Sequence, residues 1–79
     1  MSLSPAQCRA ARALVSLSQE GLADASKVAK ATIANFETGK REPYPRTLED
    51  LRHALEAAGV EFIPENGGGA GIRFRERKG

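Results

Sequence analysis

The stretch "LSQEGLADASKVAKATIANFETGK", residues 17–40, carries the pattern of two short helices joined by a turn. At each expected helix start, an apolar residue is matched by another five positions later, as in a hydrophobic staple: Leu17 with Leu22, and Val28 with Ile33. We therefore expect one helix over about residues 19–25 and a second over about residues 30–38, which Gly39 ends. Two short helices joined by a turn of three or four residues form a helix-turn-helix unit.

The second of these helices has an apolar side and a polar side, which permit two interpretations. Ile33 and Phe36 lie on the apolar side, so the helix could simply fill a core. The other side carries small and polar residues, namely Lys30, Ala31, Ala34, Asn35 and Thr38. Asn pairs with adenine through two hydrogen bonds, Lys donates to guanine, and a small methyl side chain can meet a thymine methyl. This side therefore suits the major groove of DNA.

Two further helices flank this unit. "SPAQ", residues 4–7, has the form of a capping box followed by a helix to about Ser16, with an inward stripe of Cys8, Ala11, Leu14 and Val15. "KREPYP", residues 40–45, is expected to be an exposed loop. Pro45 can then open a last helix, which Gly59 closes and whose apolar residues recur at spacings of three and four: Leu48, Leu51, Leu55 and Ala58.

The apolar period changes after Gly59. "VEFI" and "GIRFR", residues 60–63 and 71–75, alternate like strands around the glycine-rich "PENGGGAG", which predicts an antiparallel hairpin. A lone hairpin is marginal in water, so it must pack on the helices or pair with a second subunit, and its exposed edge favours the second subunit. A phosphate-binding loop is rejected, because a strand-like segment rather than a helix follows the glycines. The expected organisation is a helix-turn-helix domain over 1–59, a hairpin over 60–75 as a candidate dimerisation element, and a basic tail over 76–79.

Size and composition restrict the class of protein. The 79 residues make one domain at most, and a chain this small buries only about 60% of its unfolded surface, so a partner subunit would help. No apolar run approaches the length of a membrane span and no signal peptide is evident, so we expect a cytoplasmic protein with no membrane association. The single cysteine and single histidine, Cys8 and His53, are expected in the core and on the surface. They leave little from which to build a catalytic or metal site, so we expect no enzyme, no cofactor and no small-molecule ligand.

The net charge of +2 is weak evidence, but the charges cluster. Residues 27–46 hold five basic side chains against Glu37 and Glu42, and a second basic cluster lies within residues 73–78. Such clusters are typical of surfaces that bind phosphate, although ordinary surfaces also have them.

Residues 14–58 resemble the helix-turn-helix of the phage Cro and repressor type, the XRE family of bacterial transcriptional regulators. The resemblance is carried by "LSQEGLA", by Val28 in the turn, by "ATIANFETGKREP" and by "TLEDLRHAL". It implies a mainly α, lambda-repressor-like bundle of four to five helices, to which this chain adds the C-terminal β-hairpin. It also implies a homodimer that binds double-stranded DNA with sequence specificity and regulates transcription, with a repressor as the expected case.

The resemblance further implies roles for individual residues. Lys30, Ala31 and Asn35 fall where the family reads bases, and Thr32 falls where a small hydroxyl contacts the backbone or a base edge. Gln19 falls where the family grips a phosphate, at a helix N-terminus that attracts anions. Including Gln19, the residues expected to contact phosphates are Gln19, Lys27, Lys40, Arg41 and Arg46.

Three positions depart from the family pattern. Lys27 replaces the usual turn glycine, so either this lysine carries an unfavourable positive φ or the turn differs slightly. Ala29 replaces a capping Ser or Thr, at a cost of about 1 kcal/mol. Gly21 replaces a helical Glu, at a cost of roughly 0.5–1 kcal/mol relative to alanine. A slightly looser motif is therefore expected.

The alternative function is a protein-interaction or dimerisation module, or an antitoxin, that uses the same helical bundle. The charge of the surface around residues 30–46 distinguishes the two. An unbroken positive face favours DNA, whereas a face broken by Glu37 and Glu42 beside an apolar patch favours a protein partner.

Overall fold

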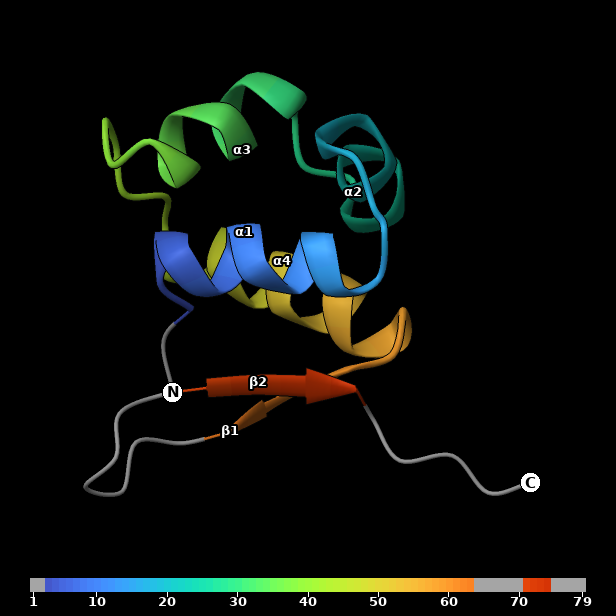
Figure 1. The fold of residues 1–79 in the computed structure, drawn as a ribbon. Helices are drawn as coiled ribbons and strands as arrows, with labels where there is room; N and C mark the ends of the chain where they lie inside the picture. The colour runs from blue at the N-terminus through green and yellow to red at the C-terminus, as the bar shows by residue number, and fades with distance from the viewer. Residues whose placement is uncertain (1–2, 64–70, 75–79) are drawn as a thin grey trace.

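The computed structural model describes residues 3–63 and 71–74, which form four helices and a two-stranded sheet. In chain order these are α1 Pro5–Leu14, α2 Gln19–Ser26, α3 Lys30–Glu37, α4 Pro45–Ala57, β1 Val60–Ile63 and β2 Gly71–Phe74. Figure 1 shows α3 at one end of the molecule, the hairpin at the other, and α1 and α4 between them. The expected helix-turn-helix bundle with a C-terminal hairpin is confirmed, with four helices in the described part of the chain.

The helix starts follow the signals in the sequence. Ser4 caps α1 through a capping box, in which its Oγ accepts from the Gln7 amide at 3.1 Å and its own amide donates to Gln7 Oε1 at 3.0 Å. Ser18 caps α2, with its Oγ accepting from the Gly21 amide at 2.9 Å. Pro45 is the first residue of α4, as expected. Local sequence therefore determines where these three helices begin.

The first helix is shorter than the sequence indicates. It ends at Leu14 instead of Ser16, because Ser16 adopts the left-handed conformation with a φ of 56°. The amides of Ser16 and Leu17 donate to Ala13 and Arg12 at 3.2 and 2.8 Å, which is the hydrogen-bond pattern of a Schellman motif. Gly39, with a φ of 79°, ends α3 in the same way. The end of α1 could not be recognised in the sequence, because Ser16 stands where a glycine usually marks the end of a helix.

The core lies between the helices and extends down to the sheet. Its buried apolar side chains come from every helix, from β1, from the residues before α1 and from the turn between α2 and α3, namely Leu3, Cys8, Ala11, Leu22, Val28, Ile33, Phe36, Leu48, Leu51, Leu55, Val60 and Phe62. Leu14 and Val15 pack against this cluster partly buried, whereas Ala58 is exposed at the C-cap of α4. Cys8 is fully buried and His53 is exposed, as expected.

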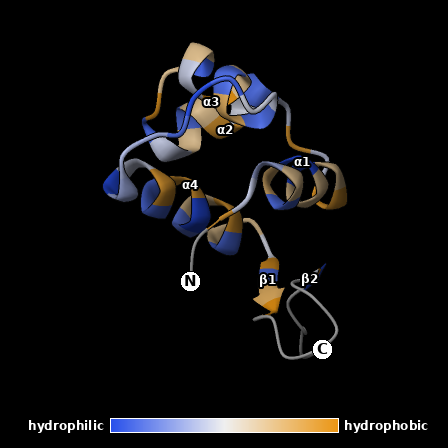
Figure 2. Cartoon of the chain, turned by 90° about the vertical axis from the view of Figure 1, so that its left-hand side faces the viewer, coloured by the Kyte–Doolittle hydropathy of each residue, from blue (hydrophilic) through white to orange (hydrophobic). Residues whose placement is uncertain are grey.

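The hairpin packs on the helices of its own chain. β1 and β2 pair antiparallel, with Val60 opposite Phe74 and Ile63 opposite Gly71. β1 contacts α4 and β2 contacts α1. Val60 and Phe62 point into the core, and Figure 2 shows the largely hydrophobic β1 beneath the helices. β1 and β2 therefore pair with each other and pack on the helices of the same chain. The predicted turn over residues 64–70, Arg75 and the predicted tail over 76–79 lie outside the described residues.

The three departures from the family pattern have structural counterparts. Lys27 ends α2 in the left-handed conformation, with a φ of 63°, which is the first of the two alternatives given above. Ala29 precedes α3 and makes no side-chain capping hydrogen bond. A Cβ at Gly21 would lie 2.9 Å from Leu17 Cδ1, so glycine avoids a close contact with that side chain.

Candidate nucleic-acid interface

Helix α3 presents one side to the core and the other to solvent. Ile33 and Phe36 are buried, whereas Lys30, Ala31 and Asn35 are exposed. Figure 1 shows this helix across the end of the molecule that lies farthest from the hairpin, so a long ligand can reach its outer side. The structure thus brings three of the four residues expected to read bases onto one accessible helix face.

The C-terminal end of α3 is fixed by a buried carboxylate. Glu37 is 3% exposed, and its two oxygens accept from Arg12 Nε and Nη2, both at 2.8 Å. Two further side chains donate to the same carboxylate: Gln19 Nε2 at 3.0 Å and Cys8 Sγ at 3.1 Å. Arg9 Nη1 donates to the main-chain oxygen of Glu37. This network, the Glu37 cluster, ties α3 to α1 and to the first residue of α2.

The Glu37 cluster changes the ionisation of its members. Burial by itself raises the pKa of Glu37, but hydrogen bonds from Arg12, Gln19 and Cys8 and the charge of Arg12 outweigh it, so the pKa is lowered. The hydrogen bond to Glu37 raises the pKa of Arg12. Burial, followed by the hydrogen bond to Glu37, raises the pKa of Cys8 well above its ordinary range. The cluster therefore holds a stable ion pair and an unreactive thiol at neutral pH.

A positive face broken by Glu37 and Glu42 was the pattern that would favour a protein partner, and the structure removes Glu37 from that surface. Residues 27–46 are all described, and of their two acids Glu37 is buried and neutralised by Arg12, so Glu42 alone is exposed. The sequence offered a signal for this, because Glu37 lies four positions after Ile33 on the buried stripe. The exposed surface is thus more positive than the sequence suggests.

The basic residues expected to contact phosphates lie around α3. Lys27 is exposed in the turn before the helix, Lys40 and Arg41 are exposed in the loop after it, and Arg46 is exposed in the first turn of α4. The loop is held to the helix, since the amide of Lys40 donates to the Asn35 oxygen at 2.9 Å. The four exposed cations therefore precede and follow α3 along the chain.

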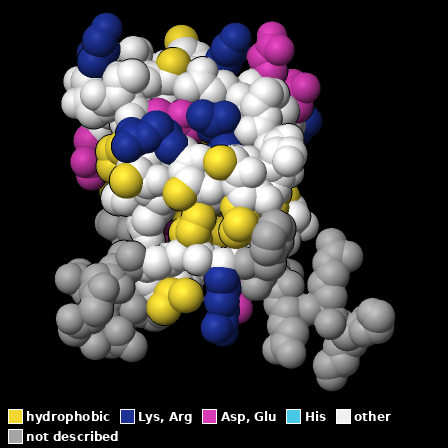
Figure 3. Space-filling model, viewed as in Figure 1, with side chains coloured by type: hydrophobic (Ala, Val, Ile, Leu, Met, Phe, Trp, Pro, Cys, Tyr) yellow, Lys and Arg dark blue, Asp and Glu magenta, His cyan; other side chains and the backbone are white. Residues whose placement is uncertain are grey.

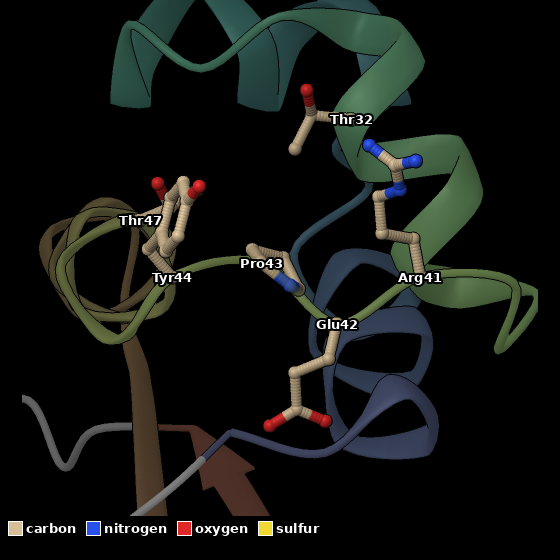
Figure 4. A pocket seen from close by; sticks show the side chains of 6 residues that line it. All are labelled: Thr32, Arg41, Glu42, Pro43, Tyr44 and Thr47. Carbon is tan, nitrogen blue, oxygen red and sulfur yellow. The ribbon is translucent and has the colours of Figure 1, made fainter.

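Thr32 belongs to a cleft beside the exposed face of α3. The cleft has a volume of about 390 Å³ and lies between α3, the following loop and the first turn of α4. It is lined by Thr32, Arg41, Glu42, Pro43, Tyr44 and Thr47. Figure 4 shows Thr32 and Arg41 on one side, Tyr44 and Thr47 on the other, and the Glu42 carboxylate turned away from Thr32. Tyr44 is 82% exposed and was missed by the sequence reasoning.

Two predicted contact residues have internal partners. The side-chain amide of Gln19 is half-buried and donates to Glu37, so it supports the fold whether or not it also meets a phosphate. Lys30 Nζ lies 4.0 Å from Glu20 Oε2 of α2, and both side chains are largely exposed. An exposed pair of this kind contributes little stability and separates readily, so Lys30 remains available to a ligand.

Comparison with known protein families gives one assignment. Residues 9–61 match the model of the helix-turn-helix family of the Cro/C1 type, also called XRE. The match begins within α1, contains α2, α3 and α4 completely and ends in β1. No curated protein matches the chain. None of the described helices is long and apolar enough to cross a membrane.

Proposed function

The chain belongs to the Cro/C1-type helix-turn-helix (XRE) family of DNA-binding regulators, and from this premise we propose that it is a sequence-specific transcriptional repressor acting as a homodimer. The observation that carries the proposal is the exposed outer face of α3, held in place by the Glu37 cluster. Two copies of α3 would enter successive major grooves about 34 Å apart. Repression would follow from occupation of a promoter.

The four side chains proposed to read sequence are Lys30, Ala31, Thr32 and Asn35. Asn35 supplies the paired donor and acceptor suited to adenine, and Lys30 supplies donors for guanine. Ala31 is small and exposed, so it permits close approach to a thymine methyl. Because long side chains are few on this face, part of the specificity would come from the shape of the DNA.

The phosphate contacts proposed are those of Gln19, Lys27, Lys40, Arg41 and Arg46. The burial of Glu37 supports these phosphate contacts. Of the two acidic residues within residues 27–46, Glu42 is then the one exposed on the surface. That charge pattern favours DNA over a protein partner. Tyr44, exposed across the cleft from Arg41, would pack against the sugar-phosphate backbone.

A titration of labelled duplexes, with the base sequence varied and binding followed by fluorescence anisotropy, tests the proposal. Four cationic contacts in each subunit of a dimer predict that log K falls with log salt with a slope of about −7. A preferred sequence should bind more tightly than random duplex at every salt concentration. Absence of binding at low salt would reject DNA as the ligand, and binding without a salt slope would reject the phosphate contacts.

A further inference from the structure

An ion pair joins α2 to the first residue of α3. Lys30 Nζ lies 4.0 Å from Glu20 Oε2, and α2 packs against α3. The side chains of Lys30 and Glu20 are 56% and 78% exposed, so both are accessible to a ligand. Lys30 begins α3, and Glu20 lies in the first turn of α2. A carboxylate therefore stands beside the lysine that is proposed to read a base.

Acidic side chains of α2 reach the end of the molecule that carries α3. The exposed acids of α2 are Glu20 and Asp24, which are four residues apart and so lie on one side of the helix. Figure 3, viewed as in Figure 1, shows acidic side chains at this end, over α2 and next to a basic side chain over the start of α3. Of the salt bridges among the described residues, one includes Glu20 and none includes Asp24. Glu20 is thus the exposed acid of α2 that is paired with a proposed DNA contact.

The position of Glu20 in the helix-turn-helix unit brings its charge close to bound DNA. In such complexes the first helix of the unit crosses the sugar-phosphate backbone, while the N-terminal residues of the second helix contact base edges. Glu20, at the start of α2, would then lie near phosphates, and Lys30 would lie near the bases. An unpaired carboxylate beside phosphates weakens binding, because like charges placed together repel each other. The charge of Glu20 therefore requires a cation in the complex, and Lys30 already supplies one.

The ammonium group of Lys30 can serve a carboxylate and a base together. It has three donors, so it can donate to Glu20 and to the O6 and N7 acceptors of a guanine at the same time. These guanine acceptors carry no net charge and tolerate a carboxylate beside them. A phosphate is an anion, so an ammonium group shared between a phosphate and Glu20 would bring two negative charges together. The ion pair therefore favours guanine over phosphate as the ligand of Lys30.

We propose that Glu20 is a specificity-determining residue that acts through Lys30. Glu20 restrains the flexible lysine and makes its contact with a phosphate unfavourable, so Lys30 strengthens binding where a guanine is present and not elsewhere. The inference rests on the base-reading role proposed above for Lys30 and adds a residue outside α3 to the determinants of sequence preference. Glu20 lowers the affinity for DNA in general and raises the preference for one sequence.

The variant Glu20→Gln tests this role in anisotropy titrations with the preferred duplex and with a random duplex of the same length. The substitution keeps the size of the side chain and removes its charge. Binding to the random duplex should tighten more than binding to the preferred duplex, so the ratio of the two affinities should fall at least about threefold. Because Lys30 of each subunit becomes free to meet a phosphate, the salt slope on the random duplex should steepen by about 2.

Asp24→Asn is the matched control, because Asp24 is also an exposed acid of α2 and lies one turn after Glu20. It should tighten binding to both duplexes by a similar factor and leave their ratio unchanged. Glu20 also lies where the dipole of α2 favours an acid. A purely structural role of that kind would shift the midpoint of urea unfolding but not the ratio of the affinities, so both quantities are measured for each variant.

The variant Lys30→Met shows whether Glu20 acts through the lysine. Methionine keeps a long unbranched side chain without a charge, so in this background Glu20→Gln should leave the ratio of affinities unchanged. A ratio that does not fall in Glu20→Gln, that falls equally in Asp24→Asn, or that falls by the same factor in the absence of Lys30 would each overturn the inference.

The same titrations separate this inference from the proposed function. If the wild type prefers one sequence and Glu20→Gln keeps the same ratio, the role of Glu20 is rejected and DNA recognition stands. If Lys30→Met keeps the wild-type ratio, Lys30 reads no base, and the roles of Lys30 and Glu20 are both rejected. Absence of wild-type binding at low salt rejects the proposed function and, with it, the role of Glu20.

Discussion

Replacing Glu37 by glutamine should destabilise the protein more than any exposed charge replacement. The substitution keeps the size of the side chain but leaves the Arg12 guanidinium without its counter-ion. Breaking a buried ion pair by removing one partner costs about 3–5 kcal/mol. The Arg12 side chain is 20% exposed and can recover some hydration, so we expect the lower end, about 3 kcal/mol. For a domain of this size that is a fall in Tm of about 12–24 °C.

The pH dependence of the same variant follows from the pKa of Glu37. That pKa is lowered in the folded chain from its ordinary value of 4.5, so the carboxylate stabilises the fold above this value. The contribution is lost as the pH falls through the lower, folded pKa. The difference between wild type and Glu37→Gln should therefore be full at pH 7 and shrink under acidic conditions, where protonated Glu37 also leaves Arg12 unpaired.

Urea unfolding followed by circular dichroism at several pH values measures both effects. Glu42→Gln is the matched control, because Glu42 is exposed, and it should change the free energy of unfolding by less than about 0.5 kcal/mol. Replacing Arg12 and Glu37 together by methionine should recover much of the loss, since no charge is then left unpaired. A loss below about 1 kcal/mol for Glu37→Gln, equal at every pH, would refute the argument that the ion pair anchors α3.

The remaining predictions concern the turn and the outer face of α3. Lys27→Gly removes a side chain from a left-handed residue and should raise the free energy of unfolding by about 1 kcal/mol in urea titrations, while DNA affinity falls if Lys27 meets a phosphate. Ala29→Ser supplies the missing cap and should stabilise the fold by about 1 kcal/mol, measured as a rise in Tm. Asn35→Ala should reduce discrimination between duplexes in anisotropy titrations, whereas Arg41→Ala should weaken all duplexes alike and flatten the salt slope by about 2, because the dimer loses one phosphate contact in each subunit.

Features that depend on local chemistry could be predicted from the sequence. The Ser4 capping box and the Pro45 helix start each involve residues a few positions apart, so their geometry follows from short-range rules. The left-handed Lys27 was instead indicated by the resemblance, because it stands where the family usually has glycine. The end of α1 was misplaced because Ser16 adopts a conformation that glycine usually marks. Local rules therefore gave the types of the elements more reliably than their limits.

Features that depend on distant partners could not be predicted in this way. The burial of Glu37 requires Arg12, which lies 25 positions earlier, and the side chain of Gln19 is drawn into the same network from α2. Nothing in the immediate neighbourhood of a glutamate shows that an arginine from another helix will reach it. The spacing of apolar residues does place Glu37 on the same side of α3 as Ile33, which is buried. Charged residues are rarely buried, however, so a glutamate at this position is expected on the surface.

The two ends of α3 are held in different ways, and this bears on how the helix would read DNA. Its last residue is Glu37, tied to α1 and α2 by charge-assisted hydrogen bonds, and its C-terminus closes in a Schellman motif at Gly39. Its first turn follows the left-handed Lys27 and lacks a side-chain cap at Ala29. The restraints specific to this chain therefore concentrate at the C-terminal end, while the proposed base-reading Lys30 sits in the less restrained turn. The proposed contact of Lys30 with a base would therefore depend on the main-chain hydrogen bonds of that turn, in which the amides of Thr32 and Ile33 donate to the Ala29 oxygen.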